Sequence, residues 1–235
     1  MCYSVENSKY KKIVNKKVSD IPDFIGKYRT QCQLTFGGGE EQNGMTPFTV
    51  YEDKVPVAIG FLKDEAPEGD WKFYNEKGAL RTEGYFEGGK KSGTWKRYAA
   101  DGTLTEINTY KDDELNGVTK LFHSNGALRM LINVKEGKRH GEVREYTEAG
   151  ALVNLSIYDE GDLIEKRYSY HRRGEESVEY EVDYKDGDVD GKVVRYYPDG
   201  KIREERTYKE GESHGTWKNY SLGSLKENRS AMGVS

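Results

Sequence analysis

A pattern of apolar and polar positions repeats every 24 residues along most of the chain. Glycines at positions 69, 93, 117 and 141 open four similar segments. Each has Trp, Thr or Val at its third position, Tyr or Phe at its sixth, Gly at its tenth and Leu at its twelfth. A fifth segment begins at Glu165 without the opening glycine, a sixth at Gly191, and a truncated seventh at Gly215. Such a fixed period indicates a repeat architecture.

Each repeat predicts a β-hairpin. In the first complete repeat we expect short strands at residues 71–74 and 80–86, with a turn between them that ends at a glycine. A second turn, such as residues 87–92, joins one hairpin to the next. The turn glycines are expected at positive φ, which other residues reach only at a cost; they are Gly78, Gly102, Gly126 and Gly200.

The same pattern predicts which side chains share a face. Residues an even number apart lie on one face of a strand, so Leu80 and Phe86 are expected together. Residues 178–184 alternate apolar residues with acids, which is typical of a half-buried strand. Trp71 and Tyr74 are three residues apart, so we expect a bulge or a strand end between them. Two further pairs are expected to share a face: Leu128 with Val134, and Ile202 with Tyr208.

A single hairpin cannot bury its own apolar side, so neighbouring hairpins must stack. We therefore predict an all-β fold, an elongated single sheet or solenoid of stacked antiparallel β-hairpins with a 24-residue repeat. We divide the chain into a non-repeat N-terminal segment or cap (1–44), a degenerate first hairpin (45–68), the hairpin repeats (69–225) and a C-terminal tail (226–235).

Composition narrows the range of functions. The 235 residues include 18 Tyr, 3 Trp and 27 Gly but only 5 Pro, with a formal net charge of −4. This makeup is typical of thin β-structure with many turns and disfavours a large enzyme with a deep apolar pocket. The acidic repeats would repel a phosphate backbone, so we expect no nucleic-acid partner. The apolar stretches are too short to span a bilayer and no secretory signal is visible, so we expect a cytoplasmic protein without membrane contact.

Catalytic and metal chemistry find little support in the sequence. His140 and His214 each directly precede an opening glycine, so we interpret them as turn residues. The spacing suggests no Ser/His/Asp or Cys/His arrangement, and we predict no catalytic residue and no cofactor. Residues 186–191 match the D-x-D-x-D-G opening of a calcium loop, but Tyr197 stands where the bidentate Glu should follow. We therefore predict a turn there and no metal site.

The segments GDWKFYNEKGALRTEGYFEGGKKSG and GTWKNY resemble the MORN-repeat variant. The 24-residue spacing is similar to that of the bacterial YwqK-type family over residues 45–225. This resemblance implies a non-enzymatic protein-binding repeat protein, and most specifically an antitoxin or immunity protein that neutralises a cognate toxin by covering its surface. The family supplies no catalytic residues. A MORN-type scaffold, or a lipid-anchored envelope protein that organises partners and is attached through Cys2, is the alternative.

The fifth repeat departs most from the pattern and is the predicted site of partner binding. Glu165 replaces the opening glycine, Glu176 replaces the leucine, and two residues are inserted. In a repeat array, specificity comes from positions that vary between units. An acidic strand face beside a basic turn would then receive the partner. The predicted partner-binding residues are His171, Arg172, Arg173, Glu179, Glu181 and Asp183.

Overall fold

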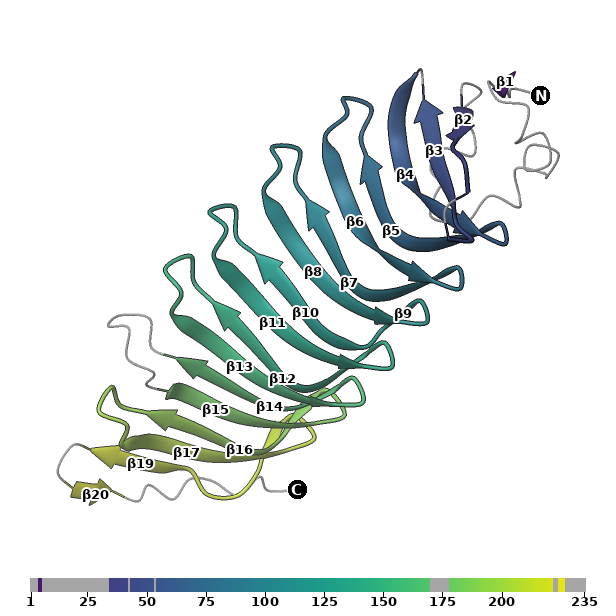
Figure 1. Ribbon diagram of the computed structural model, residues 1–235. Helices are drawn as coiled ribbons and strands as arrows, with labels where there is room; N and C mark the ends of the chain where they lie inside the picture. Colours follow the sequence, from purple (N-terminus) through teal and green to yellow (C-terminus); the bar gives the residue numbers. More distant parts are fainter. Residues whose placement is uncertain are drawn as a thin grey trace. The chain divides into compact units, whose positions relative to one another are not determined.

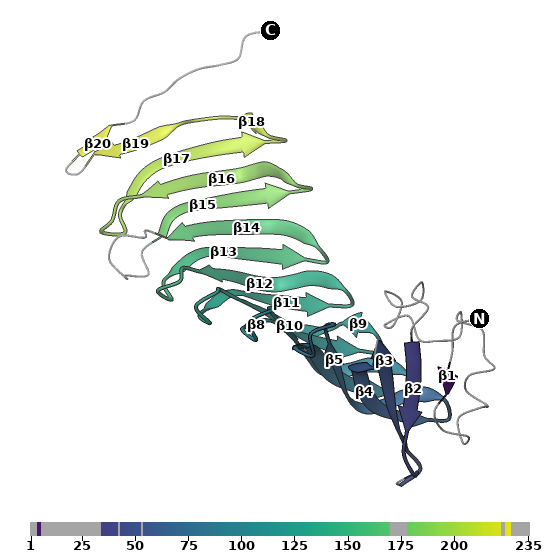
Figure 2. The ribbon, with the colours of Figure 1, turned by 90° about the horizontal axis from the view of Figure 1, so that it is seen from above.

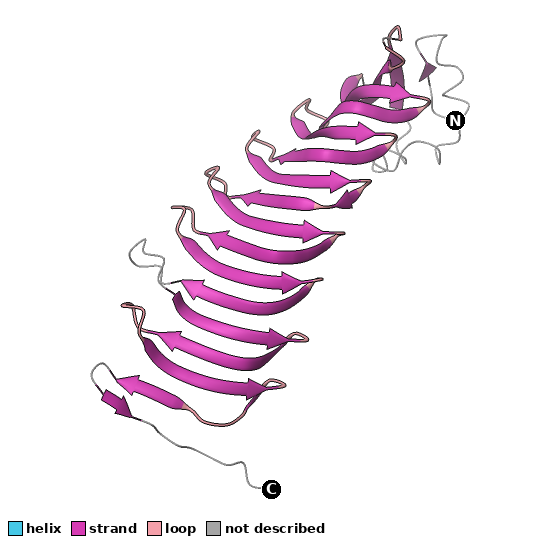
Figure 3. Ribbon diagram, turned by 60° about the horizontal axis from the view of Figure 1, so that its bottom comes forward, coloured by secondary structure: helices cyan, strands magenta, loops and turns pink. Residues whose placement is uncertain are grey.

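The computed structural model describes residues 4–5, 34–41, 43–52, 54–169, 178–221 and 224–226. The chain divides into two compact units, unit 1 (Met1–Asn116) and unit 2 (Gly117–Ser235). All regular elements in the described ranges are β-strands, drawn in magenta in Figure 3. Those ranges contain no helix with the length and apolar composition needed to cross a membrane. Cys2, Cys32 and residues 227–235 lie outside the described residues.

Unit 1 is built from consecutive antiparallel strands (Figure 1). From β2 to β9 each strand pairs with the next along the chain, and β1 pairs with β2 in parallel. The strands are β1 (Ser4–Val5), β2 (Leu34–Gly38), β3 (Thr46–Glu52), β4 (Val55–Lys63), β5 (Ala66–Tyr74), β6 (Leu80–Glu87), β7 (Lys90–Tyr98), β8 (Leu104–Lys111) and β9 (Glu114–Leu115).

Unit 2 follows the same rule, and Figure 2 shows its strands side by side. Neighbours in sequence pair antiparallel from β10 to β18, and β19 pairs with both β17 and β20. The predicted all-β class and the antiparallel hairpin repeat are confirmed. The strands are β10 (Gly117–Phe122), β11 (Leu128–Lys135), β12 (Lys138–Tyr146), β13 (Leu152–Asp159), β14 (Asp162–Ser169), β15 (Val178–Lys185), β16 (Asp188–Tyr196), β17 (Ile202–Lys209), β18 (Glu212–Ser213), β19 (Lys218–Ser221) and β20 (Ser224–Lys226).

Two kinds of turn alternate along the chain. The longer turns end at a glycine whose N–H donates to the carbonyl three residues earlier, as Gly78 does to Asn75 at 2.9 Å. The four glycines predicted to have positive φ all do so, with φ values from +77° to +88°. The shorter turns have two central residues at positive φ, for example Asp186 (55°) and Gly187 (92°), as type I′ hairpin turns require. The turn predicted for residues 186–191 is confirmed for Asp186 and Gly187 only, because residues 188–191 lie in β16.

A bulge lies beside the sixth repeat position, but the extra residue is on the second strand of the hairpin. Phe73 pairs with Thr82 and Tyr74 with Leu80, which leaves Arg81 without an opposite residue. The first strand therefore alternates normally, and Trp71 and Tyr74 lie on opposite faces. We call the face with the third repeat position the tryptophan face of each unit, and the other the tyrosine face.

This bulge corrects one prediction. Leu80 pairs with Tyr74 on the tyrosine face, whereas Phe86 pairs with Gly69 on the tryptophan face. The expectation that Leu80 and Phe86 share a face was wrong, because the extra residue reverses the alternation between them. The same register shift separates the other two pairs, Leu128 from Val134 and Ile202 from Tyr208.

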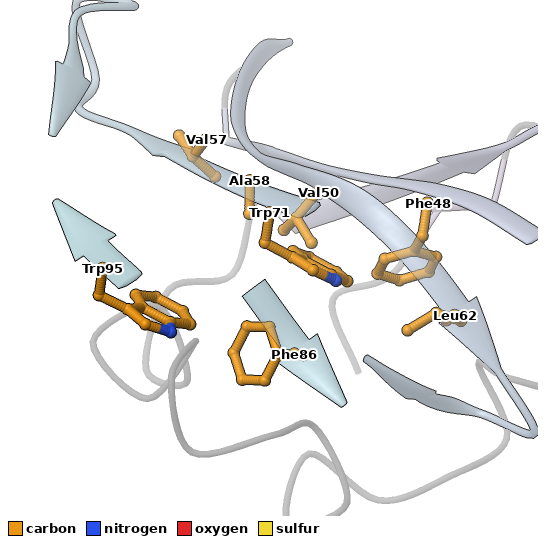
Figure 4. Close-up of a cluster of buried hydrophobic side chains, with 8 residues drawn as sticks. All are labelled: Phe48, Val50, Val57, Ala58, Leu62, Trp71, Phe86 and Trp95. Carbon is orange, nitrogen blue, oxygen red and sulfur yellow. The ribbon is translucent and has the colours of Figure 1, made fainter. Parts of the chain in front are cut away.

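The core of unit 1 lies on its tryptophan face, where two indoles pack across neighbouring strands (Figure 4). Trp71 and Trp95 are 1% and 5% exposed. Each ring lies over a glycine eleven residues earlier, because a Cβ on Gly60 or Gly84 would stand 2.2 or 2.1 Å from the ring. The other buried members of this cluster are Phe48, Val50, Val57, Ala58, Leu62 and Phe86.

A second contact fixes each indole. The Nε1–H of Trp71 donates to the carbonyl of Phe61, and that of Trp95 to the carbonyl of Tyr85, both at 3.1 Å. The acceptor is ten residues earlier in each case. This carbonyl lies at a bulge between two paired strands. There, three residues of one strand, starting with the opening glycine, face a single residue of the other, so the regular hydrogen-bond ladder is interrupted. The indole thus satisfies a backbone group that the bulge frees.

In unit 2 the corresponding positions have side chains of different volume. Ile132 lies opposite Val143, and Val182 lies opposite Val193. Two aliphatic side chains of moderate size replace the glycine and tryptophan of unit 1. Because a close-packed face must be filled without overlap, a large residue on one strand requires a small one on its neighbour.

This complementarity predicts a rescue. Gly84→Val alone should cost about 3 kcal/mol of unfolding free energy, because its side chain overlaps the Trp95 ring. Trp95→Val alone should cost about 3–5 kcal/mol through the cavity it leaves. The double variant recreates the Val182–Val193 pair and should lose about 1–3 kcal/mol less than the sum.

Urea unfolding of the four proteins, followed by circular dichroism, measures this coupling. Gly78→Ala is the control, since its φ is +77° and a Cβ there would meet nothing within 4 Å. It should cost about 1 kcal/mol with or without Trp95. Additive losses in the double variant would contradict the pairing.

Candidate functional site

The three predicted acidic residues lie on one face of β15. Val182 is buried on the tryptophan face, whereas Glu179, Glu181 and Asp183 alternate with it and lie half-buried on the tyrosine face. The predicted alternation over residues 178–184 is therefore confirmed. His171, Arg172 and Arg173 lie outside the described residues.

Two of these acids form hydrogen bonds between neighbouring strands. Glu181 accepts a hydrogen bond from the Tyr196 hydroxyl at 2.7 Å. Asp183 accepts one from the backbone N–H of Lys192 at 2.8 Å, at the bulge that precedes Val193. Both contacts join β15 to β16. These side chains therefore have a structural role in addition to the partner contact predicted for them.

The tyrosine–carboxylate contact recurs in both units. Tyr98 donates to Glu83 at 2.7 Å in unit 1, and in unit 2 Tyr220 donates to Glu205 at 2.8 Å. In each case, as for Tyr196 and Glu181, the carboxylate is fifteen residues earlier. The Tyr98 hydroxyl, followed by Lys96, lowers the pKa of Glu83. Partial burial and then the Glu83 carboxylate raise the pKa of Tyr98 to about 12.

The tyrosine face of unit 1 has an open hollow of about 330 Å³. It lies over the backbone of Trp71 and Gly84, between side chains of β5, β6 and β7. Its walls combine cations and carboxylates, and neither His nor Cys lines it. The lining side chains are Asp70, Lys72, Glu83, Tyr85, Thr94 and Lys96.

The tryptophan face of unit 2 has a chain of charged and aromatic contacts. The Arg195 guanidinium lies 4.5 Å from the Tyr180 ring centroid and 3.8 Å from Glu204. Arg206 pairs with the same Glu204 carboxylate and lies 4.2 Å from the Trp217 ring centroid. We call these five residues the arginine–aromatic network. Sequence analysis missed it, although the third tryptophan of the repeat was visible.

Trp217 breaks the rule that buries the tryptophans of unit 1. Eleven residues earlier stands Arg206 in place of a glycine, so the ring cannot lie on the backbone of β17. Ten residues earlier, the carbonyl of Thr207 already accepts the backbone N–H of His214 at 2.8 Å. Trp217 is 38% exposed as a result. Within the described ranges no residue accepts a hydrogen bond from its Nε1.

The two histidines interpreted as turn residues differ. His214 lies after the two-residue strand β18, outside the regular strands. His140 lies within β12, and its Nδ1 is 3.2 Å from the Asp159 carboxylate. The interpretation of His140 as a turn residue was wrong, because the turn before it needs only Glu136 and Gly137.

No group of three or more His, Cys, Asp or Glu in the described ranges could hold a metal ion. In the calcium-like segment, the Asp190 carboxylate accepts the backbone N–H of Glu210 at 3.2 Å. Asp186 is a turn residue with a φ of 55°. Both acids therefore have a role in the turns.

These features define a protein built from antiparallel β-hairpin repeats. The MORN repeat variant model matches residues 67–87, 91–112 and 189–210, which cover the hairpins β5–β6, β7–β8 and β16–β17. These three segments are repeats of the MORN variant type, and such repeats are typically non-catalytic binding modules. The resemblance to this repeat is confirmed. A comparison with curated proteins gives no match.

The Tyr98–Glu83 contact predicts a pKa change. Tyr98→Phe removes the hydroxyl and should raise the pKa of Glu83 toward its ordinary value of 4.5. A carboxylate with a lowered pKa contributes stability above its unfolded pKa, and this is lost as pH falls through the folded value. The variant should therefore lose less stability between pH 5 and pH 3 than the parent protein does.

Carboxyl chemical shifts measured by NMR against pH check the first effect, and urea unfolding at several pH values checks the second. Tyr110→Phe is the control, because Tyr110 packs against Trp95 on the tryptophan face. It should leave the pKa of Glu83 unchanged. An unchanged Glu83 titration in Tyr98→Phe would contradict the assignment.

Proposed function

We propose that this MORN repeat variant protein is a non-enzymatic protein-binding scaffold, with a binding surface on the tryptophan face of unit 2. The observation that carries this proposal is the arginine–aromatic network. In unit 1 the equivalent face is an apolar cluster, whereas in unit 2 it presents guanidinium groups and an exposed indole. Trp, Tyr and Arg are the residues that most often dominate protein–protein binding energy.

The geometry elsewhere favours binding over catalysis. The hollow of unit 1 is open and lined by both signs of charge, unlike a water-excluding active site. The lowered pKa of Glu83 follows from its contacts with Tyr98 and Lys96, which join neighbouring strands. A strand-joining contact accounts for this shift without a reactive role.

A narrower form of the proposal is an antitoxin or immunity protein that covers the surface of a toxin. It is supported by the sequence resemblance to the YwqK-type family, while the matched family model concerns the repeat alone. A basic toxin would be attracted to the acidic side chains of β15 on the tyrosine face. The predicted contact residues for this form are His171, Arg172, Arg173, Glu179, Glu181 and Asp183.

Co-expression of the full chain with the products of neighbouring genes tests the proposal. We expect one product to co-purify with the chain at a fixed stoichiometry. In the antitoxin form, that product is toxic alone and harmless with the chain; in the scaffold form, it is harmless alone. Failure of every neighbouring product to bind, in purification and in pairwise mixing, would count against a dedicated partner.

The proposal also places this binding in the cytoplasm. Intact mass of the chain recovered from cells tests this placement. An unmodified N-terminal segment in the soluble fraction supports it, whereas acylated Cys2 in the membrane fraction would favour the lipid-anchored alternative.

A further inference from the structure

We infer that Trp217 and Arg206 form an acid-recognition site on the tryptophan face of unit 2. The site takes a segment of a partner protein that presents an Asp or Glu carboxylate beside an apolar side chain. This inference rests on the proposed protein-binding function and specifies the chemistry of the partner.

The fold of unit 2 does not bury this tryptophan. Trp71 and Trp95 each have a glycine beneath the ring and a free carbonyl for Nε1. Trp217 has neither, because Arg206 replaces the glycine and His214 occupies the carbonyl of Thr207. One ring face packs against the guanidinium, and the side chain remains 38% exposed. Its indole can therefore contact a partner without any loss of core packing.

The arginine–aromatic network also has an excess of hydrogen-bond donors and positive charge. Arg195 and Arg206 share one carboxylate, that of Glu204, whose side chain is only 13% exposed between them. The Tyr208 hydroxyl, followed by Glu204, raises the pKa of Arg206. Each guanidinium has five N–H donors, and the Trp217 Nε1–H adds another. The Tyr180 and Tyr208 hydroxyls and Glu204 accept part of these bonds, and a partner carboxylate supplies acceptors for the rest.

The two faces of the same strands also differ in their charged residues. Lys166 lies opposite Val182 and adds a cation to the tryptophan face, two strands from Arg195 and three strands from Arg206. The tyrosine face of these strands has five acids, with Arg167 opposite Glu181 and Lys192 opposite Thr207. An acidic partner segment is therefore attracted more to the tryptophan face than to the tyrosine face. The acids of the tyrosine face are Glu165, Glu179, Glu181, Asp183 and Glu205.

Selection of a randomised dodecapeptide display library on the intact full-length chain tests the inference. We expect the selected peptides to be enriched in Asp or Glu next to Leu, Ile or Phe. For a representative selected peptide, measured by fluorescence anisotropy, Trp217→Ala and Arg206→Gln should each weaken binding at least about tenfold. Replacement of the peptide's acid by the matching amide should do the same, and high salt should weaken binding of the acidic peptide more than that of the amide.

The control is Arg139→Gln. Arg139 stacks on Tyr158 at 5.2 Å in the same unit, so this variant loses a comparable cation–π contact outside the network. It should bind the peptide like the parent protein. Arg206→Lys keeps the positive charge but loses the planar fork, so it should recover only part of the affinity. Circular dichroism of each variant confirms that the fold is retained.

Iodide quenching gives a second readout. Iodide should quench Trp217, which is exposed beside a cation, far more than Trp71 and Trp95, which are 1% and 5% exposed. Trp217→Phe should abolish most of the iodide-accessible emission. The selected peptide should protect this emission in the parent protein.

Peptides without acidic enrichment, or equal affinity for the parent protein and Trp217→Ala, would overturn the inference and leave protein binding elsewhere on the chain possible. A library that yields no binder would also overturn it, and co-purification alone would then decide the proposed function. If light scattering shows a dimer that Trp217→Ala dissociates, the occupant is a second copy of the chain and the inference fails.

Discussion

The contact on which unit 1 depends is an indole laid on the backbone of the neighbouring strand. A sheet of hairpins has little apolar area, so one large ring must cover what several aliphatic residues cover in a thicker fold. The ring fits only because Gly60 or Gly84 lies beneath it. Its N–H then satisfies the carbonyl that the adjacent bulge removes from the ladder. The bulge itself begins with the opening glycine, which has positive φ at both Gly69 and Gly93.

Unit 2 preserves the backbone of this arrangement with other side chains. Ile132 and Val143 fill the space that glycine and tryptophan fill in unit 1. Side chains also replace the indole at the bulges, since Asn133 donates to the carbonyl of Glu142 and Asp183 accepts from Lys192. The hairpins of the two units thus share two features. Each has a bulge whose backbone groups are hydrogen-bonded, and each has a space between two strands that the side chains of both strands fill together. Which residues fulfil these conditions differs from hairpin to hairpin.

This freedom explains how a structural repeat can present a binding surface. Once backbone and volume requirements are met by small aliphatic pairs, polar and aromatic side chains can occupy the rest of the tryptophan face. In unit 2 they form the arginine–aromatic network, in which Glu204 links two guanidinium groups. On the tyrosine face, acids that would be free on a simple strand instead accept tyrosine hydroxyls, as Glu181 does. Charged side chains of this protein therefore both join neighbouring strands and form the surface proposed for binding.

The repeat, the hairpins and the turns follow from the amino-acid sequence alone, because glycine spacing and strand alternation are local properties of the backbone. The sequence located the positive φ of Gly78 and Gly102 and the two faces of residues 178–184. It could not place Leu80, because the extra residue Arg81 on the same strand reverses the face between Leu80 and Phe86. Nor could it show that Glu181 is tied to Tyr196, or that Trp217 is exposed where Trp71 is buried. Those outcomes depend on which residue of the neighbouring strand lies beneath each side chain, and only the tertiary register decides that.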